Sequence, residues 1–152
     1  MSYLIEMIET AAQPVLYQRH VTSLDQLPLV IGKAYESVFS YLYERGEQPA
    51  DMPFVAYFNM DMAALEVEIG VPVSRTFDDT TDVLSGEIPA GRKVVSMYQG
   101  PYSGMTVIYD AMNQWMAERS IEPTGVVYEF YYNSPEEVPE SELLTKVVFL
   151  VK

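Results

Sequence analysis

The feature that most constrains the fold of this chain is a repeat of its own sequence. Several residues of the first half recur 74 positions later: Tyr35, Glu44, Arg45, Pro49, Tyr57 and Asn59 are matched by Tyr109, Glu118, Arg119, Pro123, Tyr131 and Asn133. The offset changes towards the ends of the repeat, where Tyr17 is matched by Tyr98 and Leu65 by Leu143. An internal duplication of this kind predicts two copies of one structural unit, related by a pseudo-two-fold axis.

The hydrophobic pattern gives both halves the same order of elements. In the first half it predicts strands over residues 3–7, 15–19, 54–58 and 65–73, and a helix that begins near Leu27 and ends at Gly46. In the second half it predicts strands over 83–88, 93–99, 126–132 and 144–151. Between the second and third of these strands, apolar residues at helical spacing predict a helix that carries Met105, Ile108, Met112 and Trp115.

These elements predict an α+β fold made of duplicated βαββ units, over about residues 3–73 and 83–151. We expect the units to share antiparallel sheet, with both helices packed on one side. The other side would then form a central ligand groove that straddles the pseudo-axis. Because a repeat of about 75 residues could scarcely bury both of its faces alone, we expect a single domain over residues 1–152.

The composition excludes several classes of function. The net charge is −13, from 22 acidic and 9 basic residues, and such a surface repels the phosphates of nucleic acids. We therefore expect no direct binding to nucleic acid. No run of about 18 apolar residues is present, so we expect no membrane span. The absence of cysteine excludes disulfides and cysteine nucleophiles, and it is compatible with a cytoplasmic location.

The sequence offers little to hold a metal ion or a cofactor. His20 is the only histidine, and the acidic stretch over residues 78–82 lacks the glycine and the terminal glutamate of a calcium loop. Phosphate-binding loops and the nucleophile motif of serine hydrolases are also absent. We therefore expect neither a metal nor a cofactor.

Glu129 is the residue that most favours a functional site. It lies in an aromatic strand, and the two-residue period of a strand places it on one face with Val127 and Tyr131. Tyr128 and Phe130 lie on the other face. A carboxylate among so many rings is either exposed to solvent or a buried anion with a function.

Further residues are candidates to line the same site: Tyr57, Glu68, Tyr98, Tyr102, Met112, Trp115 and Tyr131. Structural alternatives stay open for several of them. The spacing of Met112 and Trp115 is also typical of a helix that packs on a core. Lys146 matches Glu68 in the repeat, so an ion pair of Lys146 with Glu68 or Glu129 would explain either carboxylate without a ligand.

Several short motifs resemble the GyrI-like small-molecule-binding domain, which is also the effector-binding domain of AraC-type and BmrR-type transcription activators. The motifs occur in the family's order over nearly the whole chain: Val67 to Val73, Pro89-Ala90-Gly91-Arg92, Gly100-Pro101-Tyr102, Trp115-Met116, Tyr128-Glu129-Phe130-Tyr131 with Pro135, and Leu144-Thr145. The chain departs from the family where Tyr128 replaces a frequent tryptophan. Its halves also differ, since His20-Val21-Thr22 stands where the second repeat has Pro101-Tyr102-Ser103.

The resemblance implies that lipophilic compounds, often cationic or planar aromatic, bind in a central groove with Glu129 as the anionic anchor. It also implies two alternatives, because some stand-alone members hydrolyse cyclopropane-bearing genotoxins and others associate with DNA gyrase. A hydrolase would use Glu129 together with Tyr131 or Tyr98. A gyrase modulator would use the acidic surface to meet a protein partner. The chain has no room for a helix-turn-helix domain, so we expect a stand-alone protein; its oligomeric state is open.

Overall fold

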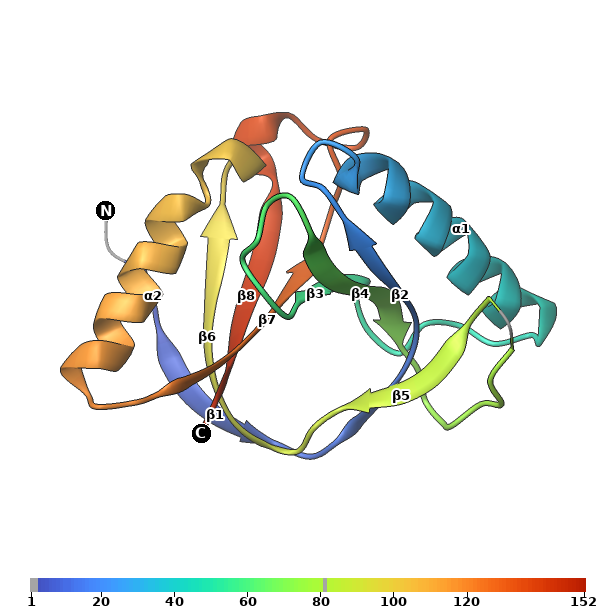
Figure 1. Cartoon of the computed structure of the whole chain (residues 1–152), viewed down its shortest axis with the longest axis horizontal. Helices are drawn as coiled ribbons and strands as arrows, with labels where there is room; N and C mark the ends of the chain where they lie inside the picture. The colour runs from blue at the N-terminus through green and yellow to red at the C-terminus, as the bar shows by residue number, and fades with distance from the viewer. Residues whose placement is uncertain (1–2, 81) are drawn as a thin grey trace. The chain divides into compact units, whose positions relative to one another are not determined.

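The computed structural model describes residues 3–80 and 82–152. The chain divides into two compact units (Figure 1). The central unit comprises Ala11–Ala90, and the terminal unit comprises the residues up to Thr10 together with Gly91–Lys152. The terminal unit is therefore built from both ends of the chain, and each unit contains one of the two predicted helices.

Both units consist of antiparallel strands and one long helix. In the terminal unit the strands are ordered β1-β6-β8-β7: β1 (Glu6–Thr10), β6 (Gly91–Gln99), β8 (Leu144–Val151) and β7 (Pro123–Tyr131). Its helix is α2 (Thr106–Glu118), with short 3-10 turns η1 (Tyr102–Gly104) and η2 (Glu140–Glu142). In the central unit the order is β3-β4-β2-β5: β3 (Phe54–Tyr57), β4 (Leu65–Pro72), β2 (Gln13–Thr22) and β5 (Leu84–Ile88), with helix α1 (Leu27–Glu44).

The α+β class and the duplication are confirmed, because the two strand orders correspond element by element. β6, α2, β7 and β8 repeat the arrangement of β2, α1, β3 and β4. The edge strands are exchanged between the repeats. β1 directly precedes β2 in sequence but pairs with β6, and β5 directly precedes β6 but pairs with β2. The sequence predicted both edge strands but not these pairings.

Fine details of the backbone also recur in the two repeats. The side chain of Asn59 donates to the carbonyl of Ala64 (3.0 Å) and accepts from the backbone N–H of Glu66 (3.1 Å). Asn133 forms the equivalent bonds with Glu142 (3.2 Å) and Leu144 (2.9 Å). In both units an asparagine therefore closes the connection into the last strand of the repeat.

The two helices end in the same way, at residues with left-handed backbone. Gly46 has a φ of 70° after α1, and Ser120 has a φ of 56° at the matching position after α2. The next N–H then turns back to the helix, as from Ile121 to the carbonyl of Met116 (2.9 Å). Glycine adopts this backbone at little cost, whereas serine is strained in it.

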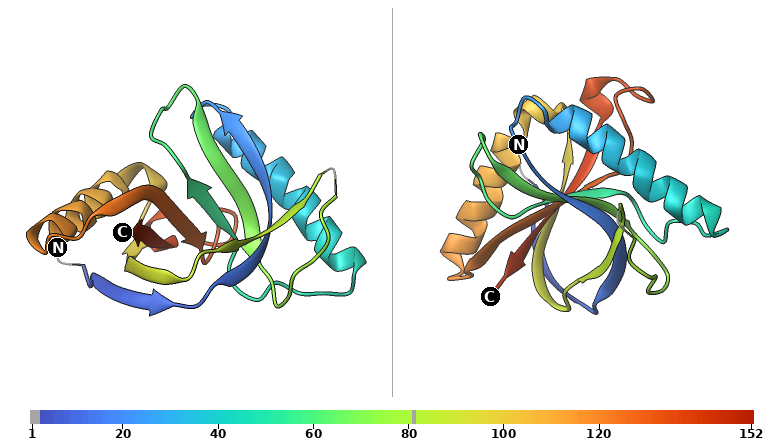
Figure 2. Two further views of the ribbon diagram at one scale, coloured as in Figure 1. Left: turned by 60° about the horizontal axis from the view of Figure 1, so that its bottom comes forward. Right: turned by 45° about the vertical axis from the view of Figure 1, so that its right-hand side comes forward.

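Each helix runs along one face of the sheet of its own unit (Figure 2). The apolar stripe of the helix packs on that face. In the terminal unit Ile108, Met112 and Met116 of α2 form a core with Val94, Tyr98, Val127, Val147 and Phe149. In the central unit Val38, Tyr41 and Leu42 of α1 form a core with Leu16, Val71 and Val73. These clusters identify which sheet face the helix covers, and this decides where the candidate carboxylates lie.

Candidate functional site

Glu129 lies in β7 on the sheet face that α2 covers. Val127, two residues earlier, belongs to the core beneath α2, and so does Val147, which pairs with Glu129 across the strands. Because side chains alternate along a strand, Glu129 points towards the same face. Only 8% of its surface is exposed. The expected position on the face turned away from the helices is therefore wrong for Glu129.

Two tyrosine hydroxyls hold the carboxyl group of Glu129. Tyr131, on the same face of β7, donates to Oε1 at 2.7 Å. Tyr109, from the beginning of α2, donates to Oε2. Burial raises the pKa of Glu129, and the two hydrogen bonds oppose that rise because they favour the charged form. Burial has the larger effect, so the folded protein holds a proton on Glu129 more tightly than an exposed glutamate would.

Aromatic rings surround this carboxyl group. The ring of Tyr102, from η1, meets the ring of Tyr131 edge-on with centroids 5.8 Å apart. The ring of Tyr109 packs edge-on against Phe149 at 5.7 Å. Tyr102 is 42% exposed, and its pKa is raised by burial and also by the negative charge of Glu129. Tyr102 is therefore the solvent-facing member of the aromatic cluster around Glu129.

Glu129 has no cationic partner within the part of the chain that the structure describes. Its hydrogen bonds come from tyrosines alone, and no ion pair includes it. The alternative of a Glu129–Lys146 pair is wrong. Lys146 pairs across the strands with Phe130, on the opposite face, and its Nζ lies 4.8 Å from the centroid of that ring.

The central unit has the same framework without the acid. Val55 occupies the position that matches Glu129, and it is completely buried. Tyr35, which matches Tyr109, donates its hydroxyl to the backbone carbonyl of Phe54 at 2.9 Å. The central unit therefore has an apolar, buried side chain at the position where the terminal unit has the carboxyl group of Glu129.

Three other predicted residues belong to the packing of the terminal unit. Tyr98 is 5% exposed, and its hydroxyl donates to the carbonyl of Pro101 at 2.8 Å. This bond stabilises the turn before η1, and the hydroxyl is therefore directed to the backbone and not to Glu129. Met112 is completely buried in the core. Trp115 packs against the same core, with the guanidinium of Arg119 4.0 Å from its ring centroid. These contacts are explained by packing in the core of the terminal unit, without a role in ligand binding.

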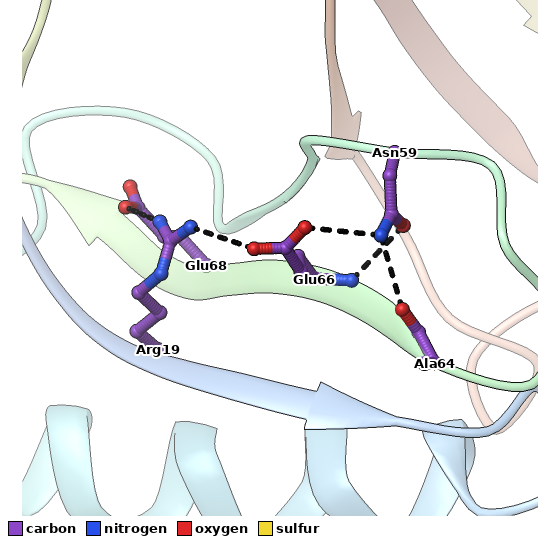
Figure 3. A network of polar contacts seen from close by, with 5 residues as sticks. All are labelled: Arg19, Asn59, Ala64, Glu66 and Glu68. Carbon is purple, nitrogen blue, oxygen red and sulfur yellow. Dashed lines mark hydrogen bonds and ion pairs between the residues drawn. The ribbon is translucent and has the colours of Figure 1, made fainter.

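Glu68 belongs to a separate polar network in the central unit (Figure 3). It lies on the face of β4 away from α1, and Arg19 donates to it at 2.8 Å. Burial raises the pKa of Glu68, and the bond from Arg19 opposes the rise. Arg19 also reaches Glu66 at 3.5 Å, and its guanidinium lies 4.8 Å from the ring centroid of Phe58. Glu68 thus has its own cationic partner, unlike Glu129.

One predicted residue remains to be placed, and one residue of the site was not predicted. Tyr57 is half-buried at the end of β3 and pairs with Val67 across the strands, at the position that matches Tyr131. Tyr109 was not among the residues that the sequence nominated for the site. The signal that could have identified it was its recurrence, since Tyr35 and Tyr109 are one of the matched pairs of the repeat.

Within the described residues, no three side chains of the metal-binding types gather to form a metal site. No described helix combines the length and the apolar character that crossing a membrane requires.

Comparison with protein families assigns the chain to one family. Residues 4–152 match the family described as the GyrI-like small molecule binding domain. No curated protein sequence matches the chain significantly.

Among solved structures, EcmrR in a complex with DNA has a TM-score of 0.83 at 18% identity and covers 99% of this chain, but this chain covers only 57% of EcmrR. SAV2435 bound to tetraphenylphosphonium has a TM-score of 0.69 at 11% identity, with 100% of this chain and 94% of that chain covered. A hydrolase from Listeria innocua has a TM-score of 0.72 at 15% identity, with 97% and 91% covered. At these identities the likeness concerns the fold alone.

Proposed function

The chain belongs to the GyrI-like small-molecule-binding family, and we propose that it binds a lipophilic, cationic or planar aromatic compound with Glu129 as the anchor. The observation that carries this proposal is the carboxyl group of Glu129 itself. It is nearly buried, it is held by two phenols, and its described contacts include no cation. A ligand cation would supply the missing positive charge.

The physical chemistry of this arrangement favours a soft organic cation. Taking a carboxylate out of water is costly unless an opposite charge approaches it, so a bound cation relieves a cost that folding has already imposed. Ring faces near the carboxylate add cation–π attraction of about 0.5–2 kcal/mol each. The bound tetraphenylphosphonium of SAV2435, a fold neighbour, is a cationic aromatic compound of this kind.

The test is a calorimetric titration with tetraphenylphosphonium at pH 8. Glu129→Gln keeps the shape of the side chain and removes its charge, so we expect affinity to fall by about 1.5–3 kcal/mol, or roughly 10- to 150-fold. Glu136→Gln is the matched control, because it changes the net charge equally at an exposed loop position and should leave affinity unchanged. Equal affinity of the wild type and Glu129→Gln would refute the anchoring role.

A hydrolase is the second candidate, favoured by the phenols at the carboxyl group. Tyr109 and Tyr131 both reach Glu129, so a carboxyl group and a proton-donating hydroxyl lie within hydrogen-bond distance of each other. In this case Glu129 would activate a water molecule or protonate the leaving atom, with Tyr131 as its partner. Turnover of an electrophilic cyclopropane compound that is lost in both Glu129→Gln and Tyr131→Phe would support catalysis. Binding of the compound without turnover would contradict the hydrolase, and only the binding function would remain.

A further inference from the structure

Four large apolar side chains are exposed on two joined segments of the central unit. Val21 is 66% exposed, Leu24 52%, Met60 65% and Met62 48%. They come from the end of β2, the following turn and the β3–β4 connection. The backbone N–H of Leu24 donates to the carbonyl of Met62 at 2.9 Å, which joins the two segments. We call these four residues the methionine patch.

The loop that carries the two methionines is built to hold them in this position. Asp61 accepts from the backbone N–H groups of Ala63 (through Oδ1, 3.0 Å) and Ala64 (through its carbonyl, 3.0 Å). Asn59 spans the base of the loop with the bonds to Ala64 and Glu66 drawn in Figure 3. The exposure of Met60 and Met62 is therefore a property of a hydrogen-bonded loop.

The fold does not require this exposure, as the matching loop of the terminal unit shows. That loop is closed by Asn133 in the same way as Asn59 closes its counterpart. Yet no large apolar side chain of its described residues 134–143 is exposed. Its exposed positions include Glu136 and Glu137. The same framework thus carries an apolar tip in one repeat and an acidic tip in the other.

The charges in the two segments that form the methionine patch are negative. Asp25, Asp61 and Glu66 lie in these segments. Arg19, at the edge of the patch, pairs with Glu66 at 3.5 Å, so the exposed charges without an ion pair in the described part of these segments are those of Asp25 and Asp61. The chain as a whole carries a charge of −13. Such a field attracts cationic partners and repels a second copy of this chain. An apolar centre with an acidic rim is complementary to an apolar surface with a basic rim.

We propose that the methionine patch is a docking surface for a protein segment that is apolar on one side and carries lysine or arginine beside that side. Methionine suits this role because its unbranched, polarizable side chain adapts to partners of varied shape. An amphipathic basic helix lying with its apolar face on the patch is the simplest such segment. This surface uses none of the residues of the Glu129 site.

The test uses a synthetic amphipathic helix of leucine and lysine, about 18 residues or five turns long. The full chain, labelled with ¹³C at its methionine methyl groups, is titrated with this peptide and followed by NMR. We expect the signals of Met60 and Met62 to shift, and the affinity of the double variant Met60→Gln/Met62→Gln to be at least about tenfold weaker. Met52→Gln is the matched control, since Met52 is 38% exposed on the same unit but outside the patch.

Several results would overturn the proposal. Equal binding of a leucine–glutamate helix would show that charge complementarity plays no part. Undiminished binding of the leucine–lysine helix to Met60→Gln/Met62→Gln would place the contact elsewhere. If the chain dimerises with increasing concentration and the double variant does not, the occupant is a second copy of the chain. If tetraphenylphosphonium alone shifts the methyl signals of Met60 and Met62, the patch binds small molecules. Glu129→Gln should leave peptide binding unchanged, which separates this test from that of the anchoring role.

Discussion

Removal of one hydroxyl group, in Tyr131→Phe, tests whether Glu129 is held as a buried anion. The hydroxyl donates to Glu129 Oε1 at 2.7 Å, and the carboxyl group is only 8% exposed, so water cannot readily replace the bond. A hydrogen bond to a buried charged group contributes about 1.5–3 kcal/mol. We therefore expect Tyr131→Phe to lower the free energy of unfolding by about that amount at pH 8, while the phenyl ring keeps its contact with Tyr102.

The assay is urea unfolding followed by the fluorescence of Trp115, the only tryptophan, which lies in the terminal unit. A double-mutant cycle with Glu129→Gln isolates the interaction. In the Glu129→Gln background the same hydroxyl faces a neutral amide, so its removal should cost only about 0.5–1.5 kcal/mol. Tyr43→Phe, at an exposed tyrosine of α1, is the control and should stay within about 0.5 kcal/mol of the wild type.

The pH dependence of the free energy of unfolding tests whether Glu129 is a buried anion. Because burial raises the pKa of Glu129 in the folded protein, folding favours its protonated form. The stability that Glu129 contributes is complete below its ordinary pKa and is lost as pH rises through the raised folded pKa. Glu129→Gln should remove this slope, and the coupling to Tyr131 should shrink as the carboxyl group protonates. Equal costs of Tyr131→Phe in both backgrounds at every pH would refute the assignment of a buried anion.

Three further substitutions test the framework of the fold by thermal or urea unfolding. Ser120→Gly should raise the free energy of unfolding by about 0.5–1 kcal/mol because it relieves a φ of 56°, and a lower stability would contradict that account. Gly70→Ala should lower the free energy of unfolding by about 3 kcal/mol or more, since a Cβ there would lie 2.0 Å from the carbonyl oxygen of Leu16. Gly32→Ala in α1 is the control and should not destabilise, because a Cβ there would have nothing within 4 Å. Similar costs at both sites would be inconsistent with this packing. Asn59→Ala should cost about 2 kcal/mol through the bonds that close the β3–β4 loop, and a neutral effect would show that the loop does not need them.

The repeat and the hydrophobic periods were sufficient to predict the class of the fold and nearly all of its elements. Matched residues such as Asn59 and Asn133 proved to play the same structural part, so the duplication was visible from side chains alone. The exchange of β1 and β5 was not visible. An edge strand has the same period whichever neighbour it joins, and only tertiary packing determines that β1 pairs with β6.

The site was predictable in part. The two-residue period correctly placed Glu129 and Tyr131 on one face, where the hydrogen bond between them is now observed. Period alone does not say which face a helix covers, and the expectation that Glu129 points away from the helices was wrong for that reason. Tyr109 was missed because its contact with Glu129 depends on how α2 packs on the sheet, which no local pattern encodes.

The most direct test of the central claim is the number of protons released when a permanent cation binds. Tetraphenylphosphonium has no titratable group, so calorimetry in buffers of different ionisation enthalpy reports only the protein's protons. A cation beside Glu129 lowers the pKa of the carboxyl group, so we predict that binding releases a fraction of a proton. This fraction should be largest at pH values between the pKa of Glu129 in the bound protein and its pKa in the free protein, and it should vanish at high pH. Binding to the wild type without proton release across the acidic range, or the same release from Glu129→Gln, would contradict the account.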